Sequence, residues 1–233
     1  MGKITYGRRS PVDVMHRMMI RYDRNLRRLA IGLAALAGYV DAIGFLKSGG
    51  LFVSFMSGNS TRMAIGIAEG ATAALAAAGL IALFVFGVFA TLIVTTKMTA
   101  AHRKVVAVSC LAALLLGAAI LQTLGLDRAT VAFLCLAMGA SNTVFRRNGE
   151  VSIGVSYMTG TLVKLGGKLA EAALGGSRSD WLPYLLLWLA LLVGGIIGAA
   201  GYAWSPDGSI GLAAAAAAAL VPVTQALTRS AAR

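Results

Sequence analysis

The sequence predicts an all-α polytopic membrane protein with about six transmembrane helices, two broken or re-entrant helical segments and an inverted internal repeat of three plus three spans. Three observations predict this fold class: an apolar composition, apolar runs of membrane-spanning length, and two similar halves. Of the 233 residues, 58% are hydrophobic and only 13% are charged, and the mean hydropathy is +0.78. In a soluble domain about a quarter of the residues are charged, so a bilayer is the expected surrounding.

The pattern divides the chain into four parts. In order, these are a cytoplasmic basic amphipathic segment at 1–28, a first membrane repeat at 29–126, a second membrane repeat at 127–228 and a cytoplasmic tail at 229–233. In the first part Met15 and Met18 fall on one helical face and Arg17 and Arg21 on another, which predicts a helix lying on an anionic leaflet. A positive-inside tail that only sets orientation explains these residues equally well.

Apolar runs long enough to cross a bilayer, at about 20 residues each, follow in both repeats. The predicted spans are Leu29–Leu46, Thr72–Met98, Val105–Leu126, Arg128–Phe145, Trp181–Trp204 and Ser209–Ala226. Two further segments, Leu51–Glu69 and Ser152–Leu174, have a helical pattern but contain polar residues. These two interrupted segments occupy equivalent places in the two halves.

The internal repeat is read from two aligned stretches. "FMSGNSTRMAIGIAEG" from Phe55 aligns with "YMTGTLVKLGGKLAEA" from Tyr157, and upstream "GYVDAIGF" aligns with "GASNTVFR". The second alignment places Asp41 opposite Asn142. Each half therefore contains a helix with Asp or Asn, an interrupted polar segment and two apolar helices.

The distribution of Lys and Arg predicts the topology, because cytoplasmic loops carry an excess of both. If the two interrupted segments enter and leave by the same face, nearly all basic residues become cytoplasmic. These are the N-terminal cluster, Lys97, Arg103, Lys104, Arg146, Arg147, Arg178, Arg229 and Arg233, which leaves only Lys47 and Arg128 outside. Three crossings per half is an odd number, so the second half is expected to be inverted. The predicted location is the bacterial inner membrane, multi-pass, with both termini cytoplasmic.

The interrupted segments predict a binding site for an anion. Breaks are expected at Gly58-Asn59 and Gly160-Thr161, since broken helices at membrane depth line cavities or are buried in protein. Half-helices that begin near Ser57 and Thr159 would point free N–H groups at a common midplane site, with a cation one turn inside. The candidate substrate-binding residues are Ser57, Gly58, Asn59, Thr61, Arg62, Thr159, Gly160, Thr161 and Lys164. Alternatively, the hydroxyls hold helices together and the cations reach an interface.

Asp41 and Asn142 are the candidate coupling or ion-pair residues. Asp41 is the only acidic residue well inside a predicted span. It could accept a proton, bind a coupling cation or neutralise Arg62, and an unpaired buried carboxylate is costly.

The same stretches resemble a known family. "GYVDAIGFLKSGGLFVSFMSGNSTRMA" together with "ASNTVFRRNGEVSIGVSYMTGTLVKLGGKLAEA" resembles the YoaK-like family of bacterial inner-membrane proteins, grouped under a domain of unknown function. The resemblance runs from Leu29 to the last helix. It implies a polytopic inner-membrane protein of about six spans with a role related to transport, and it brings no substrate.

The expected function is a small transporter or channel for a small anionic solute. Two alternatives are a non-transporting scaffold or regulatory subunit, and a cation- or proton-coupled transporter that uses Asp41. An enzyme is not expected, because His16 and His102 lie outside the spans and no paired carboxylates or metal motif occur. No cofactor, metal or nucleic acid is expected as a partner. The expected partners are the lipid bilayer, the solute and, as an option, a second copy of the chain.

Overall fold

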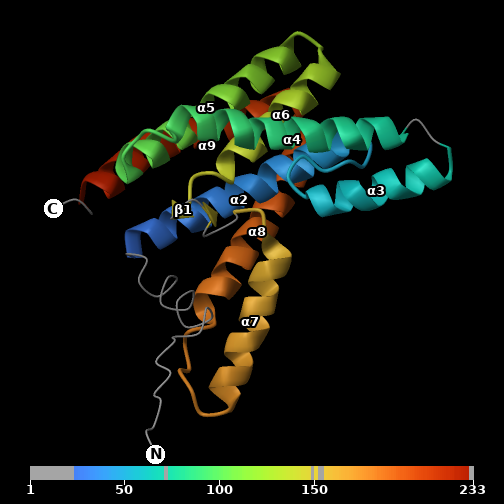
Figure 1. The fold of residues 1–233 in the computed structure, drawn as a ribbon. Helices are drawn as coiled ribbons and strands as arrows, with labels where there is room; N and C mark the ends of the chain where they lie inside the picture. Colours follow the sequence, from blue (N-terminus) through green and yellow to red (C-terminus); the bar gives the residue numbers. More distant parts are fainter. Residues whose placement is uncertain (1–23, 71–72, 148–149, 152–154, 231–233) are drawn as a thin grey trace, which may run out of the picture.

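The computed structural model describes residues 24–70, 73–147, 150–151 and 155–230. Within these ranges it is a helical bundle with one very short hairpin (Figure 1). The elements in order are α2 (Arg24–Lys47), α3 (Met56–Ala68), α4 (Ala73–Thr95), α5 (Ala100–Thr123), α6 (Asp127–Ser141), β1 (Arg146–Arg147), β2 (Glu150–Val151), α7 (Met158–Ala173), α8 (Leu182–Trp204) and α9 (Pro206–Ser230). Most of the predicted basic segment, residues 1–23, and residues 231–233 of the predicted tail lie outside the described ranges.

Five of the described helices are long and apolar enough to cross a membrane: α2, α4, α5, α8 and α9. They match five of the six predicted spans. The sixth, Arg128–Phe145, forms α6, which has 15 residues and is shorter than the predicted span. Most of α6 is buried against α4 and α5, so protein rather than lipid surrounds it. The all-α polytopic fold class is confirmed, and the small β1–β2 hairpin was not predicted.

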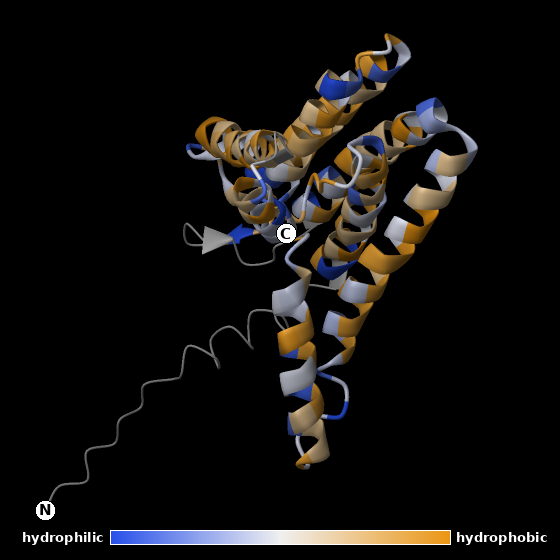
Figure 2. Ribbon diagram, turned by 90° about the vertical axis from the view of Figure 1, so that its right-hand side faces the viewer, coloured by the Kyte–Doolittle hydropathy of each residue, from blue (hydrophilic) through white to orange (hydrophobic). Residues whose placement is uncertain are grey.

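Apolar side chains on the outer helices point away from the bundle. In Figure 2 hydrophobic residues colour long stretches of the helices. On α4, Phe86, Phe89 and Ile93 are more than half exposed, and on α8 so are Ile196 and Ile197. A soluble monomer rarely exposes apolar patches of this extent. The exposed apolar faces therefore fit contact with lipid.

Equivalent glycines let the two halves pack on each other in the same way. A Cβ added at Gly38 of α2 would lie 2.0 Å from the carbonyl oxygen of Leu191 on α8, and one at the aligned Gly139 of α6 would lie 2.3 Å from that of Phe84 on α4. Conversely, Gly194 of α8 approaches α2 with a hypothetical Cβ 1.9 Å from the oxygen of Ala35. Because any side chain would collide with backbone there, the glycines set how closely α2 packs on α8 and α6 on α4.

Equivalent helices from the two halves run in opposite directions. Lys47, the last residue of α2, forms an ion pair with Asp127, the first residue of α6. Near the end of α5, the amide of Gln122 donates to the carboxylate of Asp207 at the start of α9, at 2.6 Å. α2 packs against α6 and α5 against α9, so both pairs are antiparallel, as Figure 1 also shows.

Candidate functional site in two loop–helix units

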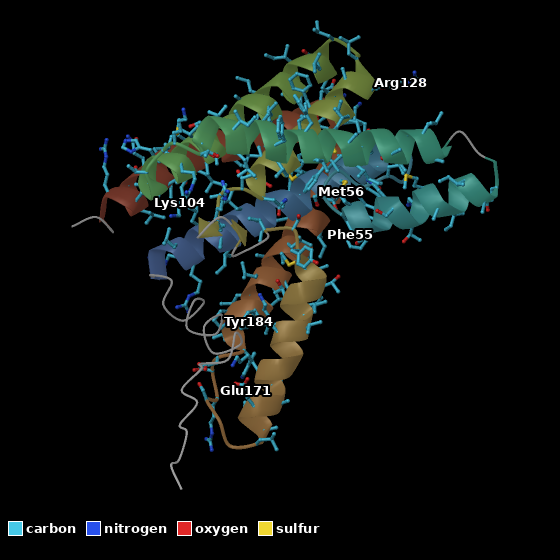
Figure 3. All side chains as sticks on the ribbon, in the orientation of Figure 1. Phe55, Met56, Lys104, Arg128, Glu171 and Tyr184 are labelled. Atoms are coloured by element: carbon cyan, nitrogen blue, oxygen red, sulfur yellow. The ribbon has the colours of Figure 1, made fainter. Side chains whose placement is uncertain are left out.

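The residues singled out by the sequence lie in two structural units. The first loop–helix unit comprises residues 48–68, and the second comprises the described residues from 155 to 173. In each, a non-helical segment leads into a helix, α3 or α7. Figure 3 shows Phe55 and Met56 at the start of α3.

The first unit turns back along α2. Gly49 and Gly50 have positive φ angles of 74° and 112°, which glycine adopts without strain, and the amide of Gly50 donates to the Phe45 oxygen at 2.8 Å. The rings of Phe45 and Phe52 then lie 4.7 Å apart. A Cβ on Gly44 would lie 2.6 Å from Val53 Cγ1. The extended chain thus packs antiparallel against the last turns of α2.

Asp41 holds this extended segment. Its Oδ1 accepts hydrogen bonds from the backbone N–H groups of Val53, at 2.9 Å, and Ser54, at 2.8 Å. Both N–H groups belong to backbone outside any helix, and unpaired backbone groups are costly away from water. Asp41 therefore stabilises the non-helical approach to α3.

Asn59 holds the same segment from the other side. Its Oδ1 accepts from the N–H of Phe52 at 2.9 Å, and its Nδ2 donates to the carbonyl oxygen of Phe52 at 2.7 Å. The residue is 0% exposed. Both polar ends of the Asn59 amide therefore have main-chain partners within the unit.

Arg62 lies on aromatic rings. Its guanidinium carbon is 5.5 Å from the centroid of Phe45 and 5.9 Å from that of Phe52, within the range of a cation–π interaction. The residue is exposed. Within the described ranges, Asp41 and Arg62 form no ion pair, since the Asp41 carboxylate bonds to loop amides instead.

α3 and α7 begin at Met56 and Met158, one residue before the expected starts near Ser57 and Thr159, but the breaks expected at Gly58-Asn59 and Gly160-Thr161 lie a few residues earlier in the chain. Gly58 and Gly160 lie inside the first turns of α3 and α7, and the irregular backbone comes before each helix. A Cβ at Gly58 would lie 2.5 Å from a ring carbon of Phe55, and one at Gly160 would lie 2.9 Å from a ring carbon of Tyr157. Glycine is needed at both places because the preceding aromatic ring folds over the helix start.

The candidate hydroxyl groups lie in the first two turns of α3 and α7. Ser57, Thr61 and Thr159 are exposed. The hydroxyl of Thr61 donates to the Ser57 oxygen at 3.2 Å, and that of Thr161 donates to the Tyr157 oxygen at 3.2 Å. Hydroxyls that bond to the preceding turn of their own helix still keep an acceptor position for a ligand.

The second unit is held by an equivalent contact. Oδ1 of Asn142 accepts from the N–H of Ser156 at 3.5 Å and from its hydroxyl at 3.2 Å, just as Asp41 accepts from Ser54. Lys164, which is aligned with Arg62, is half-buried on α7. Two aligned side chains thus hold two aligned segments.

The two units remain apart in the described ranges. α3 packs against α4, α7 packs against α8, and no packing contact joins α3 to α7 among the described residues. The expected meeting of both half-helices at one point is therefore not formed here. The nearest link between the two polar contacts is the packing of α2, which carries Asp41, against α6, which leads to Asn142.

The sequence interpretation missed three features of these units. Ser54 and Ser156 could have been found, because "SFMSG" and "SYMTG" continue the repeat by one residue. No pattern in the sequence predicted that Arg62 would pack on the rings of Phe45 and Phe52. Lys168 on α7, only 8% exposed, is paired with Glu171 at 2.5 Å, and its i,i+3 spacing was a usable signal.

Comparisons with known proteins agree on one family. Residues 29–223 match a family described as "Protein of unknown function (DUF1275)". The chain is 31% identical over 179 residues to "UPF0700 transmembrane protein RA0705" of Rhizobium meliloti (strain 1021), covering 74% of this chain and 77% of that protein. No solved structure matches it. The match confirms the family resemblance and the multi-pass membrane class, and the chain belongs to the DUF1275 family of proteins of unknown function.

Proposed function

We propose that the protein is a small transporter or channel for a small anionic solute in the bacterial inner membrane, built as an inverted repeat with both termini cytoplasmic. One observation carries the proposal: antiparallel, equivalent helices each lead into a non-helical segment held by an aligned polar side chain, Asp41 or Asn142. Non-helical backbone between inverted halves is the arrangement on which many secondary transporters bind their solutes.

The path of the first unit supports re-entry rather than a crossing. The chain reverses after α2 and returns as far as Asp41, where Ser54 is held. α3 then runs outward, because Arg62 lies beside Phe45, one turn further along α2. α3 therefore has the same direction as α2, and the unit enters and leaves by one face. This leaves three crossings per half, which is the count that inverts the second half.

The charges near the helix starts favour an anion. The positive end of the helix dipole lies at the start of α3 and of α7, although several first-turn N–H groups, among them those of Met56, Asn59 and Thr161, already donate to main-chain oxygens. Arg62 and Lys164 lie within the first two turns, and Ser57 and Thr159 are exposed in the first turn of the same helices. The acidic candidate, Asp41, is already engaged by two backbone N–H groups. An anion can thus be bound in each unit without repulsion from an uncompensated carboxylate.

Flux into proteoliposomes tests the proposal. Purified protein would be reconstituted and assayed with a panel of small inorganic and carboxylate anions, in wild-type form and as the double variant Arg62→Gln/Lys164→Gln. We expect anion flux that falls at least tenfold in the double variant, since each lost charge weakens anion binding by roughly tenfold. Arg128→Gln, which removes an exposed cation elsewhere, is the matched control and should transport normally.

Other outcomes separate the alternatives. Flux that depends on Na⁺ or on a pH gradient, and that disappears in Asp41→Asn, would replace the anion proposal with a cation- or proton-coupled transporter. No flux of any solute from folded protein would contradict transport and leave a scaffold or regulatory subunit.

A further inference from the structure

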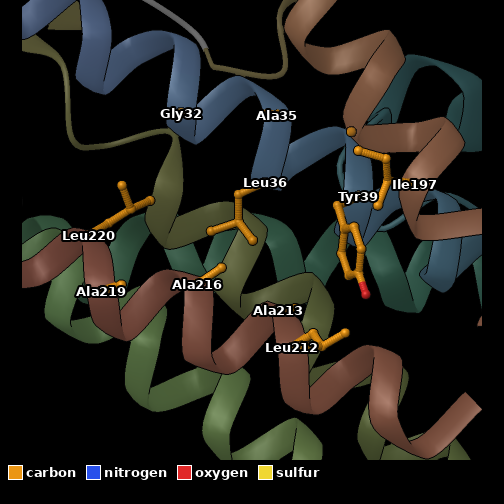
Figure 4. Close-up of a pocket in the computed structure, with 11 residues that line it drawn as sticks. Gly32, Ala35, Leu36, Tyr39, Ile197, Leu212, Ala213, Ala216, Ala219 and Leu220 are labelled. Atoms are coloured by element: carbon orange, nitrogen blue, oxygen red, sulfur yellow. The ribbon is translucent and has the colours of Figure 1, made fainter. Parts of the chain in front are cut away.

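An apolar groove of about 490 Å³ runs between α2, α8 and α9, away from both loop–helix units (Figure 4). Gly32 and Ala35 of α2 line it together with small residues of α9 and several larger side chains. The larger residues in Figure 4 are Leu36, Tyr39, Ile197, Leu212 and Leu220. The groove is open on one side, where the bilayer would lie.

The groove exists because α9 carries a run of alanines. Ala216 and Ala219 line it and are exposed, so no side chain of α9 fills the space beside α2. The hydroxyl of Tyr39 donates to the Ser209 oxygen at 2.9 Å, which leaves an apolar ring on the wall. A surface of this kind fits a hydrocarbon chain.

Arg28 stands at one end of the groove. It is exposed and precedes Gly32 by four residues on α2, so both lie on the same helical face, with Arg28 one turn nearer the helix start. Gly32 in turn lies beside Leu220 of α9. Arg28 therefore lies one turn beyond Gly32, on the helical face that lines the groove and toward the end of the bundle.

This end of the bundle is basic. The starts of α2 and α5 and the end of α9 lie together there, since α5 and α9 are antiparallel neighbours and α2 packs on α9. They carry Arg27, Arg28, Arg103, Lys104 and Arg229. Figure 3 shows Lys104 at this end and Arg128 at the opposite one. None of the acidic residues with described side chains lies on these three helix ends.

We propose that the groove holds one anionic phospholipid, with an acyl chain along α2 and α9 and its phosphate at Arg28. Guanidinium groups bind phosphate oxygens in a bidentate manner, and basic pockets between transmembrane helices on the cytoplasmic side bind anionic headgroups. From Arg28 to Tyr39 the helix rises about 16 Å at 1.5 Å per residue. That length corresponds to about half of a hydrocarbon core of about 30 Å, which is one leaflet.

Native mass spectrometry of the full chain in detergent tests the proposal. Dioleoyl phosphatidylglycerol and dioleoyl phosphatidylcholine, which share their acyl chains, would be titrated in turn. We expect one phosphatidylglycerol to be retained more strongly, and Arg28→Gln to weaken its binding roughly fivefold, as the loss of one cation near an anionic lipid predicts. Phosphatidylcholine binding should not respond to Arg28→Gln, and Arg128→Gln should change neither lipid.

Filling the groove gives a second, independent test. Ala216→Phe occupies the groove and should abolish retention of the lipid. Ala215→Phe, an exposed alanine facing the separate groove between α5 and α9, should retain it. Equal binding of both lipids, or unchanged retention in Ala216→Phe, would overturn the proposal. So would a dimer of the wild-type chain that Ala216→Phe dissociates, because a second copy would then occupy the groove.

Discussion

Asp41 and Asn142 show how a single side-chain oxygen can hold a non-helical chain inside a bundle. Each accepts from the backbone of a segment that leaves its helix, at Ser54 in one half and at Ser156 in the other. The first contact uses a carboxylate that accepts from two backbone N–H groups, at 2.9 and 2.8 Å, and the second uses a neutral amide that accepts from one N–H group at 3.5 Å and from the Ser156 hydroxyl at 3.2 Å. Hydrogen-bond acceptance is therefore the shared requirement, and the charge of Asp41 is an addition specific to the first half.

Replacement of Asp41 separates these two properties. Asp41→Ala removes the acceptor of two backbone N–H groups, and we expect it to destabilise the protein by about 3 kcal/mol, as buried unpaired donors do. Asp41→Asn keeps an acceptor oxygen and should cost less than half of that. Thermal unfolding in detergent measures both values. Equal destabilisation by the two variants would contradict this account and show that the charge itself holds the segment.

Asn59 offers a second test at the same scale. It bonds to both the N–H and the oxygen of Phe52, so Asn59→Ala leaves one backbone donor and one acceptor unpaired. The expected loss is about 2 kcal/mol of unfolding free energy. Ser60→Ala, an exposed neighbour whose hydroxyl bonds only to Met56 of its own helix, is the control and should change little. If Asn59→Ala instead unfolds like wild type and fails only in anion flux, its amide acts on the solute.

Helices of the two halves approach each other closely at glycines, and the aligned Gly38 and Gly139 take part in equivalent contacts. Gly38 and Gly194 bring α2 and α8 into backbone contact, while Gly139 brings α6 against α4. Close approach at small residues is the usual way in which helices associate in lipid, where apolar side chains gain nothing by leaving the bilayer. Through these contacts each half packs directly on the other.

Alanine substitution tests this packing. A Cβ at Gly194 would lie 1.9 Å from the Ala35 oxygen, so Gly194→Ala must push α8 away from α2. We expect a loss of about 3 kcal/mol of unfolding free energy, the upper end of the range for overpacked cores. Gly79→Ala on α4, where nothing lies within 4 Å, should stabilise its helix by about 0.5–1 kcal/mol. Both changes are read from unfolding curves, and equal effects would contradict the packing role.

Opposed directions of equivalent helices organise the molecule as a whole. Two polar contacts join the end of a helix in the first half to the start of a helix in the second half. They are the ion pair of Lys47 with Asp127 and the hydrogen bond of Gln122 to Asp207. In the proposed topology, two halves with three crossings each would place their loop–helix units at opposite faces of the membrane. The proposed transport depends on this arrangement.

Cysteine accessibility tests the arrangement. In a background with Cys110 and Cys135 replaced, single cysteines at Gly49 and Gly70 flank the first loop–helix unit. We expect a membrane-impermeant maleimide to label both from the periplasmic face of spheroplasts, and a cysteine at Lys97 only after the membrane is permeabilised. Labelling of the cysteines at positions 49 and 70 from opposite faces would show that the unit crosses the membrane. It would contradict the proposed inverted repeat.

Composition and repeat spacing alone predicted the membrane class, five of the described spans and the equivalent positions of Asp41 and Asn142 in the two halves. These properties depend on apolar length and on similarity along the chain, and both are local in sequence. The partners of the polar residues depended on the tertiary structure. Asn59 bonds to Phe52, and Arg62 packs on aromatic rings rather than on Asp41. A side chain with several possible partners takes the one that the fold brings within about 3 Å, and only the reversal of the chain after α2 decides which one that is.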